Sequence, residues 1–195
     1  MPPAVRFNRE AVLNAAYQLV RREGPNALNA RAVARELGGS TQPIFRLFSG
    51  MEELKRAVTE LALLTWKDSL AERVRQSAFP YLSIGMAYLI FARDESQLFK
   101  LLFMRDRVSD GSLTDYNFSW GVPLIENSIK VDVDTATKLY EANWLYCHGL
   151  AVMIATKYIP CMSECQMRQM LVESLQGAAM QLHVTLPTID QCKDI

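Results

Sequence analysis

Hydrophobic residues recur at helical spacing through most of this chain, and no segment shows the strict alternation of a half-buried strand. The first stripe, from Val12 to Val20, repeats every three or four residues and stops before Gly24 and Pro25. We therefore predict an all-α fold. The predicted helices are Arg9–Glu23, Ala30–Leu37, Ser40–Phe48, Gly50–Arg75, Tyr81–Ala92, Glu95–Met104, Gly121–Ile129, Thr135–Ile159 and Glu164–Leu182.

Polar residues stand at the expected starts of these helices, where a side-chain oxygen can accept a hydrogen bond from a free backbone N–H. The predicted N-caps are Asn8, Ser40, Ser49, Asp94, Asp134 and Ser163. A Glu or Gln follows three of them at the capping-box position, namely Glu52, Gln97 and Gln166. The buried face of the long helix is predicted to hold Leu54, Ala57, Val58, Leu61 and Leu64.

Residues 29–48, NARAVARELGGSTQPIFRLF, contain two short helices joined by a turn at Gly38 and Gly39. This arrangement is typical of a helix-turn-helix, whose second helix enters the DNA major groove. Thr41 and Gln42 lie at the start of that helix, and Arg46 lies one turn further on. Gln can pair with adenine, Arg with guanine or phosphate, and the Thr methyl with thymine. Three polar residues on a short helix can also be merely solvated, but the surrounding motif favours DNA contact.

The charge distribution agrees with a DNA-binding segment. Half of the 195 residues are hydrophobic and 22% are charged, as in ordinary globular proteins. The net charge of zero hides nine Lys and Arg against five Asp and Glu in residues 1–56, and twelve against sixteen in the remainder. A basic segment on an acidic body suits a module that binds a polyanion. We expect a DNA-binding domain at 1–50 and a helical ligand-binding and dimerisation domain at 51–195.

Several other protein classes are not indicated by the sequence. The longest nearly apolar stretch, 81–92, is well below the roughly 20 residues that span a bilayer. The four cysteines lie in the last quarter, where they suit reduced thiols in a cytoplasmic protein. With two histidines and no phosphate loop, nucleophile elbow or HExxH motif, we expect no metal, no cofactor and no enzymatic activity.

The order of parts over about residues 7–58 resembles the TetR family of transcriptional regulators. The positions that match the family's motif are Ala16, Gly24, Ala34, Gly38, Ser40, Ile44, Phe48, Glu53 and Leu54. The resemblance implies a homodimer, held by a four-helix bundle of the last two helices, that binds a palindromic DNA operator. It also implies a small-molecule pocket among the middle helices, whose ligand changes the spacing of the two DNA-binding heads.

The resemblance also suggests which residues meet DNA: Asn29, Arg31, Ser40, Thr41, Gln42, Phe45 and Arg46. Asn29 and Arg31 stand where the family often contacts phosphates. Phe45, Leu47 and Met51 replace the Tyr, His and Lys that are frequent in the family, so three possible phosphate donors are missing. A flexible N-terminal arm with Arg6 and Arg9 is a possible compensation.

Large aromatic residues are frequent in the helical body, where they can form an ordinary core or line a cavity for an apolar or aromatic ligand. The predicted ligand-binding residues are Trp66, Tyr88, Phe103, Trp120, Tyr140, Asn143, Trp144 and Cys147.

Small residues at helical spacing on the last two helices indicate a self-complementary surface or, alternatively, packing within one protomer only. The predicted dimer-interface residues are Gly149, Val152, Met167, Met170, Leu171, Ser174 and Ala178. The sequence thus predicts a ligand-responsive transcriptional regulator, more specifically a repressor. The alternative is a helical small-molecule binding or signalling module with weak or lost DNA binding.

Overall fold

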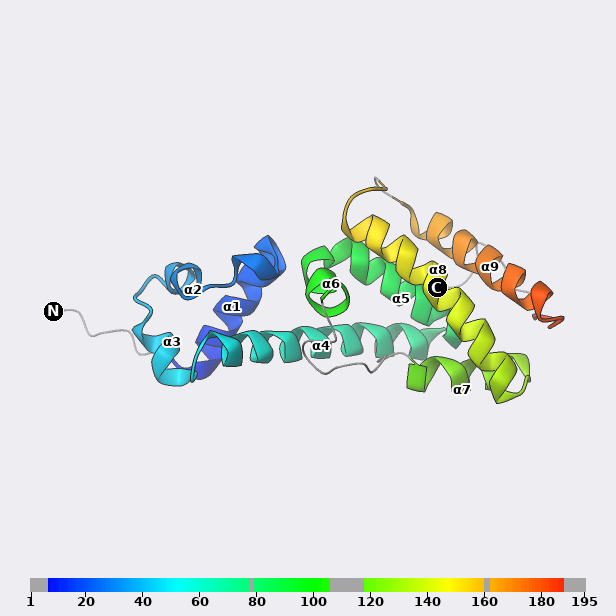
Figure 1. The fold of residues 1–195 in the computed structure, drawn as a ribbon, viewed down its shortest axis with the longest axis horizontal. Helices are drawn as coiled ribbons and strands as arrows, with labels where there is room; N and C mark the ends of the chain where they lie inside the picture. The colour runs from blue at the N-terminus through cyan, green and yellow to red at the C-terminus, as the bar shows by residue number, and fades with distance from the viewer. Residues whose placement is uncertain (1–6, 78, 106–117, 160–161, 188–195) are drawn as a thin grey trace. The chain divides into compact units, whose positions relative to one another are not determined.

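The computed structural model describes residues 7–77, 79–105, 118–159 and 162–187, apart from the side chains at 76 and 118–120. Within these ranges the chain forms α-helices and one short 3₁₀ helix but no strand, as predicted (Figure 1). Its packing divides it into two compact units. The first unit, which we call the head unit, consists of two segments: the described residues up to Trp66, and Glu95–Arg105. The second, which we call the body unit, holds Lys67–Asp94 and the described residues from 118 onward. This division differs from the expected boundary near residue 50.

The head unit begins with α1 (Arg9–Glu23), whose bounds match the prediction. Its N-cap is Asn8, as predicted, because Asn8 Oδ1 accepts a hydrogen bond from the Ala11 N–H at 2.8 Å. The predicted stripe is buried at Val12, Ala16, Leu19 and Val20. A short 3₁₀ helix, η1 (Pro25–Ala27), follows, and α1 packs against it and against the two helices of the turn motif.

The turn motif consists of α2 (Ala30–Glu36) and α3 (Gln42–Leu47). Gly38 adopts the left-handed φ of +65° that ends α2, a conformation in which glycine meets no Cβ penalty. The prediction that Ser40 caps α3 is wrong, since the N-cap position is Thr41 and its side chain caps nothing. Pro43 has no N–H to offer, and the Ile44 N–H already donates to the Thr41 carbonyl at 3.1 Å.

At the start of the long helix α4 (Met51–Gln76), the acidic residue that accepts a hydrogen bond from the preceding backbone is not the predicted one. Glu53, not Glu52, accepts a hydrogen bond from the Ser49 N–H, at 2.6 Å, while Glu52 pairs with Lys55. Every fourth residue is buried within the head unit, at Leu54, Val58, Ala62 and Trp66. The prediction that Leu64 is buried is wrong, because 56% of that residue is exposed.

The body unit contains the end of α4 together with α5 (Pro80–Asp94), α7 (Phe118–Ile129), α8 (Val133–Ala155) and α9 (Glu164–Gln181). The helix α5 contacts α7, α8 and α9, and it is buried almost all round between Tyr81 and Ala92 (Figure 1). The short helix α6 (Ser96–Phe103) belongs to the head unit, where it packs against α1.

The later helix starts agree with the predictions only in part. Ser163 and Gln166 form the predicted capping box of α9. The predicted caps Asp94 and Asp134 are wrong. The cap position of α6 is Glu95, without a side-chain hydrogen bond, and Asp132 caps α8 by accepting from the Thr135 N–H at 3.0 Å. Asp94 and Asp134 instead form ion pairs with Arg93 and Lys138.

Candidate functional site

The outer face of α3 presents most of the side chains that were predicted to meet DNA. Ser40, Gln42, Phe45 and Arg46 are exposed, and Thr41 is half-buried. Because Gln42 and Arg46 lie four residues apart, their side chains share one side of the helix. The two groups, an amide and a guanidinium, are those that recognise purine edges in a major groove.

The Arg46 side chain forms a hydrogen bond with the backbone just before α1. Its Nη2 donates to the Phe7 carbonyl at 3.3 Å, so the guanidinium lies beside the N-terminus of α1. The Phe7 ring in turn lies about 3.4 Å from the place where a Cβ on Gly39 would stand. The backbone before α1 therefore packs against the turn motif and restrains Arg46.

Phe45 is 55% exposed, which is unusual for a large apolar side chain. It lies between Gln42 and Arg46 in the sequence of α3. An exposed ring at this place cannot donate a hydrogen bond to a phosphate, but it can contact a thymine methyl group.

The two positions at the start of α2 play different roles. Asn29 is the N-cap, since its Oδ1 accepts from the Ala32 N–H at 3.0 Å and its Nδ2 donates to the Ala27 carbonyl at 3.1 Å. Its Oδ1 and one of its two Nδ2 hydrogens therefore already have partners, which leaves the second Nδ2 hydrogen for the predicted phosphate contact. Arg31, two residues further along the chain, is exposed and forms no ion pair with the described side chains.

Arg9 is a structural residue of the head unit and not part of a free arm. Its Nη1 donates to the Leu47 carbonyl at 2.7 Å, its Nη2 pairs with Glu53 at 2.8 Å, and its guanidinium lies 4.0 Å from the centre of the Phe48 ring. Hydrogen bonds from Ser49 and then from Arg9 lower the pKa of Glu53 to about 2. Arg9 thus joins the start of α1 to the end of α3 and the start of α4. Arg6 lies outside the described residues.

Two further arginines of α1 are used in ion pairs. Arg21 makes a two-pronged hydrogen bond with Glu95, and Arg22 bridges Glu23 and Glu36. The hydrogen bond from Arg22 lowers the pKa of Glu36. Three arginines of the head unit are exposed and form no ion pair with the described side chains: Arg31, Arg46 and Arg56.

In the body unit, a small cavity of about 30 Å³ brings together five of the eight residues predicted to bind a ligand. We call it the Asn143 cavity. Its lining residues are Tyr81, Ile84, Gly85 and Tyr88 from α5, and Tyr140, Asn143, Trp144 and Cys147 from α8. The prediction missed the three residues Tyr81, Ile84 and Gly85, although their spacing with Tyr88, three and four apart, marks one side of α5.

Polar groups in and beside the Asn143 cavity are few. Asn143 Nδ2 donates to the Tyr81 hydroxyl at 3.0 Å, and the Cys147 thiol donates to the Gly85 carbonyl at 3.6 Å. Burial raises the pKa of Cys147 to about 12 and also raises the pKa of Tyr81. Both groups are therefore neutral near pH 7. The Tyr88 hydroxyl lies 2.8 Å from His148 Nδ1, which fixes the outer end of that side chain.

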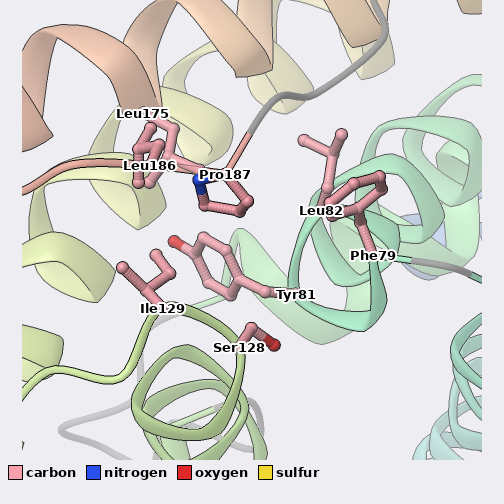
Figure 2. A pocket seen from close by; sticks show the side chains of 8 residues that line it. All are labelled: Phe79, Tyr81, Leu82, Ser128, Ile129, Leu175, Leu186 and Pro187. Atoms are coloured by element: carbon pink, nitrogen blue, oxygen red, sulfur yellow. The ribbon is translucent and has the colours of Figure 1, made fainter.

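A second cavity, of about 20 Å³, lies on another side of Tyr81 (Figure 2). We call it the Leu186 cavity. Its lining residues are Phe79, Tyr81, Leu82, Ser128, Ile129, Leu175, Leu186 and Pro187. Figure 2 shows the Tyr81 ring among the apolar side chains of Ile129, Leu175 and Leu186. Tyr81 is therefore a wall that the two cavities share.

Two other predicted ligand-binding residues, Trp66 and Phe103, do not line these cavities. Trp66 and Phe103 belong to the head unit, where their rings pack edge to face with centres 5.8 Å apart. Their large side chains serve as core there. The side chain of Trp120 lies outside the described residues.

The residues predicted for a dimer interface divide into two groups. Gly149 is exposed, and Val152, Met170, Ser174 and Ala178 are half-buried. Met167 and Leu171 have 0% exposure and belong to the protomer's own core, so the structure contradicts their assignment to an open surface. On a helix these two positions share a side that faces inward.

No group of three or more His, Cys, Asp or Glu among the described residues is placed to hold a metal ion. None of the helices in this part of the chain is both long enough and apolar enough to cross a membrane.

Comparisons with known proteins relate this architecture to solved structures. No protein-family model matches the sequence, and a search of curated proteins finds no relative. The chain is similar to a TetR-like transcriptional regulator from Rhodococcus sp. RHA1, with a TM-score of 0.62 and 19% sequence identity. The similarity covers 94% of this chain and 98% of that protein. The chain therefore has the fold of a TetR-like regulator, which confirms the predicted all-α architecture.

Proposed function

We propose that this chain is a transcriptional regulator that binds a palindromic DNA operator as a homodimer and responds to a small, mainly apolar molecule in its body unit. The observation that supports this best is the exposed pair Gln42 and Arg46 on the second helix of a helix-turn-helix. The similarity to a protein described as a TetR-like regulator agrees with it.

The charge of the head unit also favours DNA as the partner. Two of its exposed arginines have no carboxylate partner among the described residues and lie in the turn motif. Arg31 lies at the start of α2, and Arg46 lies in α3. Guanidinium groups that are not neutralised by the protein are available to phosphates.

A homodimer would use the open side of α8 and α9. Leu145 is 64% exposed there, and beyond the helix's own backbone Gly149 and Gly177 have no atom within 4 Å of the place where a Cβ would stand. Small residues allow a second helix to approach closely, and Leu145 supplies apolar surface. The proposed interface keeps Gly149, Val152, Met170, Ser174 and Ala178 and excludes Met167 and Leu171.

A ligand in the body would act by preferring one of two protomer arrangements, in one of which the heads fit DNA. A coupling of about 1–3 kcal/mol changes DNA affinity roughly 5- to 150-fold. We propose release from DNA, which makes the chain a repressor.

The proposal can be tested by selecting bound duplexes from a random DNA library and measuring affinity for the winners at several salt concentrations. We expect selected sites with two-fold symmetry and an affinity that falls steeply with salt. Gln42→Ala should weaken binding and relax selection at one base pair, whereas the matched variant Gln18→Ala, exposed on α1, should not. Duplexes without a common sequence would contradict operator recognition.

A second candidate is a helical small-molecule binding module with weak or lost DNA binding. Arg9 is engaged and Asn29 is partly engaged within the protein, and Phe45 lacks a hydroxyl, so fewer phosphate donors remain than the motif suggests. Ligand binding without any duplex selection in the same experiment would favour this candidate.

A further inference from the structure

Asn143 is a buried polar residue with unused hydrogen-bonding capacity. Only 5% of its surface is exposed, and it lines the Asn143 cavity. Its Nδ2 donates to the Tyr81 hydroxyl at 3.0 Å, but its Oδ1 has no partner among the described residues. Buried side-chain oxygens are nearly always hydrogen-bonded, because leaving one without a partner is costly. A buried acceptor without a partner, on a residue that lines a cavity, points to a ligand that supplies a donor.

The free capacity belongs to the Asn143–Tyr81 pair and does not depend on which way round the amide is turned. As described, Asn143 Oδ1 is an open acceptor, and the Tyr81 hydroxyl, which accepts from Nδ2, still has its own proton to donate. If the amide turned by half a circle, Tyr81 would donate to Oδ1, which would leave Nδ2 as a donor and the Tyr81 oxygen as an acceptor. In both arrangements at least one donor and one acceptor stay open. A single hydroxyl group, which both donates and accepts, matches either arrangement.

We infer that the body unit binds an uncharged, mainly apolar molecule that carries a hydroxyl group, and that this hydroxyl bonds to the Asn143–Tyr81 pair. The inference deepens the proposed function, on which it rests, by naming the chemical class of the effector. Alcohols and phenols fit this description.

The surroundings of the pair exclude a charged ligand. Among the described residues, no Lys, Arg, Asp or Glu lines the Asn143 cavity or the Leu186 cavity. Burial keeps Tyr81 and Cys147 neutral, since it raises the pKa of both groups. A carboxylate or ammonium group would therefore lose its hydration without meeting an opposite charge.

The Leu186 cavity, beside the Asn143 cavity, offers apolar surface for the rest of the ligand. Tyr81 lines both cavities, and beyond its ring lie the apolar side chains of Leu82, Ile129 and Leu175 (Figure 2). The two cavities, of about 30 and 20 Å³, have room for water-sized molecules only, whereas benzene occupies an engineered cavity of about 150 Å³. Binding therefore requires the lining side chains to move apart, and displacement of the Tyr81 ring, which lines both cavities, would join the two spaces.

The test compares matched probes that differ only in the hydroxyl group. The full chain is titrated with phenol and toluene, with cyclohexanol and methylcyclohexane, and with benzoate as a charged probe. The readout is the NMR signal of the Asn143 side-chain amide, which is identified by its absence in Asn143→Leu. We expect each hydroxylated probe to bind about tenfold more tightly than its methyl partner and to shift the amide signal, and benzoate to do neither.

Asn143→Leu should reduce the preference for the hydroxyl to less than about twofold, while the matched variant Asn14→Leu, at an exposed position of α1, should keep it. Tyr81→Phe retains the ring and should also lose most of the preference, and it takes over the test if Asn143→Leu does not fold. Equal binding of the paired probes, a preference that persists in both variants, tighter binding of benzoate, or no binding of any probe would each overturn the inference.

The outcome is separable from that of the proposed function, because the titration needs no DNA. If the chain selects a duplex but shows no preference for the hydroxyl group, the regulator proposal is supported and the proposed class of ligand is wrong. A hydroxyl preference without duplex selection would do the reverse.

Discussion

Arg9 is a single side chain whose role in the head unit can be separated from a role in DNA binding. Arg9→Ala removes the hydrogen bond to the Leu47 carbonyl, the pair with Glu53 and the contact over the Phe48 ring. At an exposed site we expect these to total about 1 kcal/mol, which lowers the unfolding midpoint by roughly 2–4 °C in a chain of this length. Scanning calorimetry measures the change.

Arg56→Ala, at an exposed position without a carboxylate partner among the described residues, should leave the midpoint unchanged. The slope of log DNA affinity against log salt should stay the same in Arg9→Ala, because Arg9 neutralises a carboxylate and not a phosphate. A slope reduced by about one would show that Arg9 leaves Glu53 to bind DNA.

Glu53 makes the stability of the head unit depend on acid pH. Its pKa in the folded chain is about 2, against an ordinary 4.5, because Ser49 and Arg9 hydrogen-bond to the carboxylate. A lowered pKa contributes stability that is fully present above the unfolded value and is lost as pH falls towards the folded one. We therefore expect the unfolding midpoint to fall between about pH 5 and pH 2, and Glu53→Gln to weaken this fall. Glu52→Gln is the matched control, since Glu52 is 86% exposed and bonds only to Lys55 among the described residues. An identical pH profile for both variants would contradict the assignment.

The side chains whose exposure could be predicted from the sequence are those whose position depends on nearby residues in the chain. Gln42 and Arg46 are exposed because the turn motif itself orients α3, and that motif is legible in twenty consecutive residues. Arg9 and Asn143 were harder to interpret, since their partners Glu53 and Tyr81 lie 44 and 62 positions away in the chain. No local pattern distinguishes a paired arginine from an arm that is free to bind phosphate.

The helices themselves were predictable, but the side that each one buries was less so. In α4 the buried residues of the head unit are four apart, and each step of four turns the helix by about 40° beyond a full circle. The buried stripe therefore winds round the helix from Leu54 to Trp66, which leaves Leu64 exposed. A prediction that assumes one straight stripe cannot detect this winding, because it depends on which elements pack against α4.

On α3, the missing phosphate donor at Phe45 gives a test of how this helix lies on DNA. The ring is 55% exposed, so Phe45→Tyr adds a hydroxyl to open surface without a change in the core. We expect the hydroxyl to reach a phosphate and to tighten binding to the selected duplex about threefold to tenfold, as for one added hydrogen bond. The salt slope should not change, because a neutral donor releases no counterion. Phe45→Leu is the control for the ring, and unchanged affinity in Phe45→Tyr would mean that this side of α3 does not face the backbone.

The division of the protomer into units was the part of the fold least accessible from sequence. The short helix α6 follows α5 directly in the chain, yet it packs against α1, where Arg21 bonds to Glu95 across 74 positions. The added Cβ of any other residue at Gly24 would lie 2.6 Å from the Gln97 side chain, which shows how closely the two segments meet. A domain boundary predicted from composition divides the chain at one point. It therefore cannot show that a later segment, such as α6, packs against the first helix.

The proposed dimer can be tested without disturbing the protomer. Gly149 and Gly177 are exposed, and a Cβ added at either position meets nothing within 4 Å beyond the helix's own backbone. Because glycine is a poor helix former, replacing both with Gln should leave the fold intact and stabilise the protomer slightly. If a second α8–α9 pair packs on this surface, the longer side chains keep the helices apart.

We therefore expect the double variant Gly149→Gln with Gly177→Gln to sediment at the monomer mass of 22.1 kDa while the unmodified chain sediments as a dimer. Its affinity for a two-fold symmetric duplex should fall by about 100-fold or more, since the second head no longer binds as part of the same particle. Its affinity for a single half-site should not change, because Gln42 and Arg46 are untouched. Asn14→Gln, which lies on the exposed side of α1, is the neutral control. A double variant that remains dimeric would place the contact between protomers on another surface, and a chain that is monomeric before substitution would remove the basis for palindromic recognition.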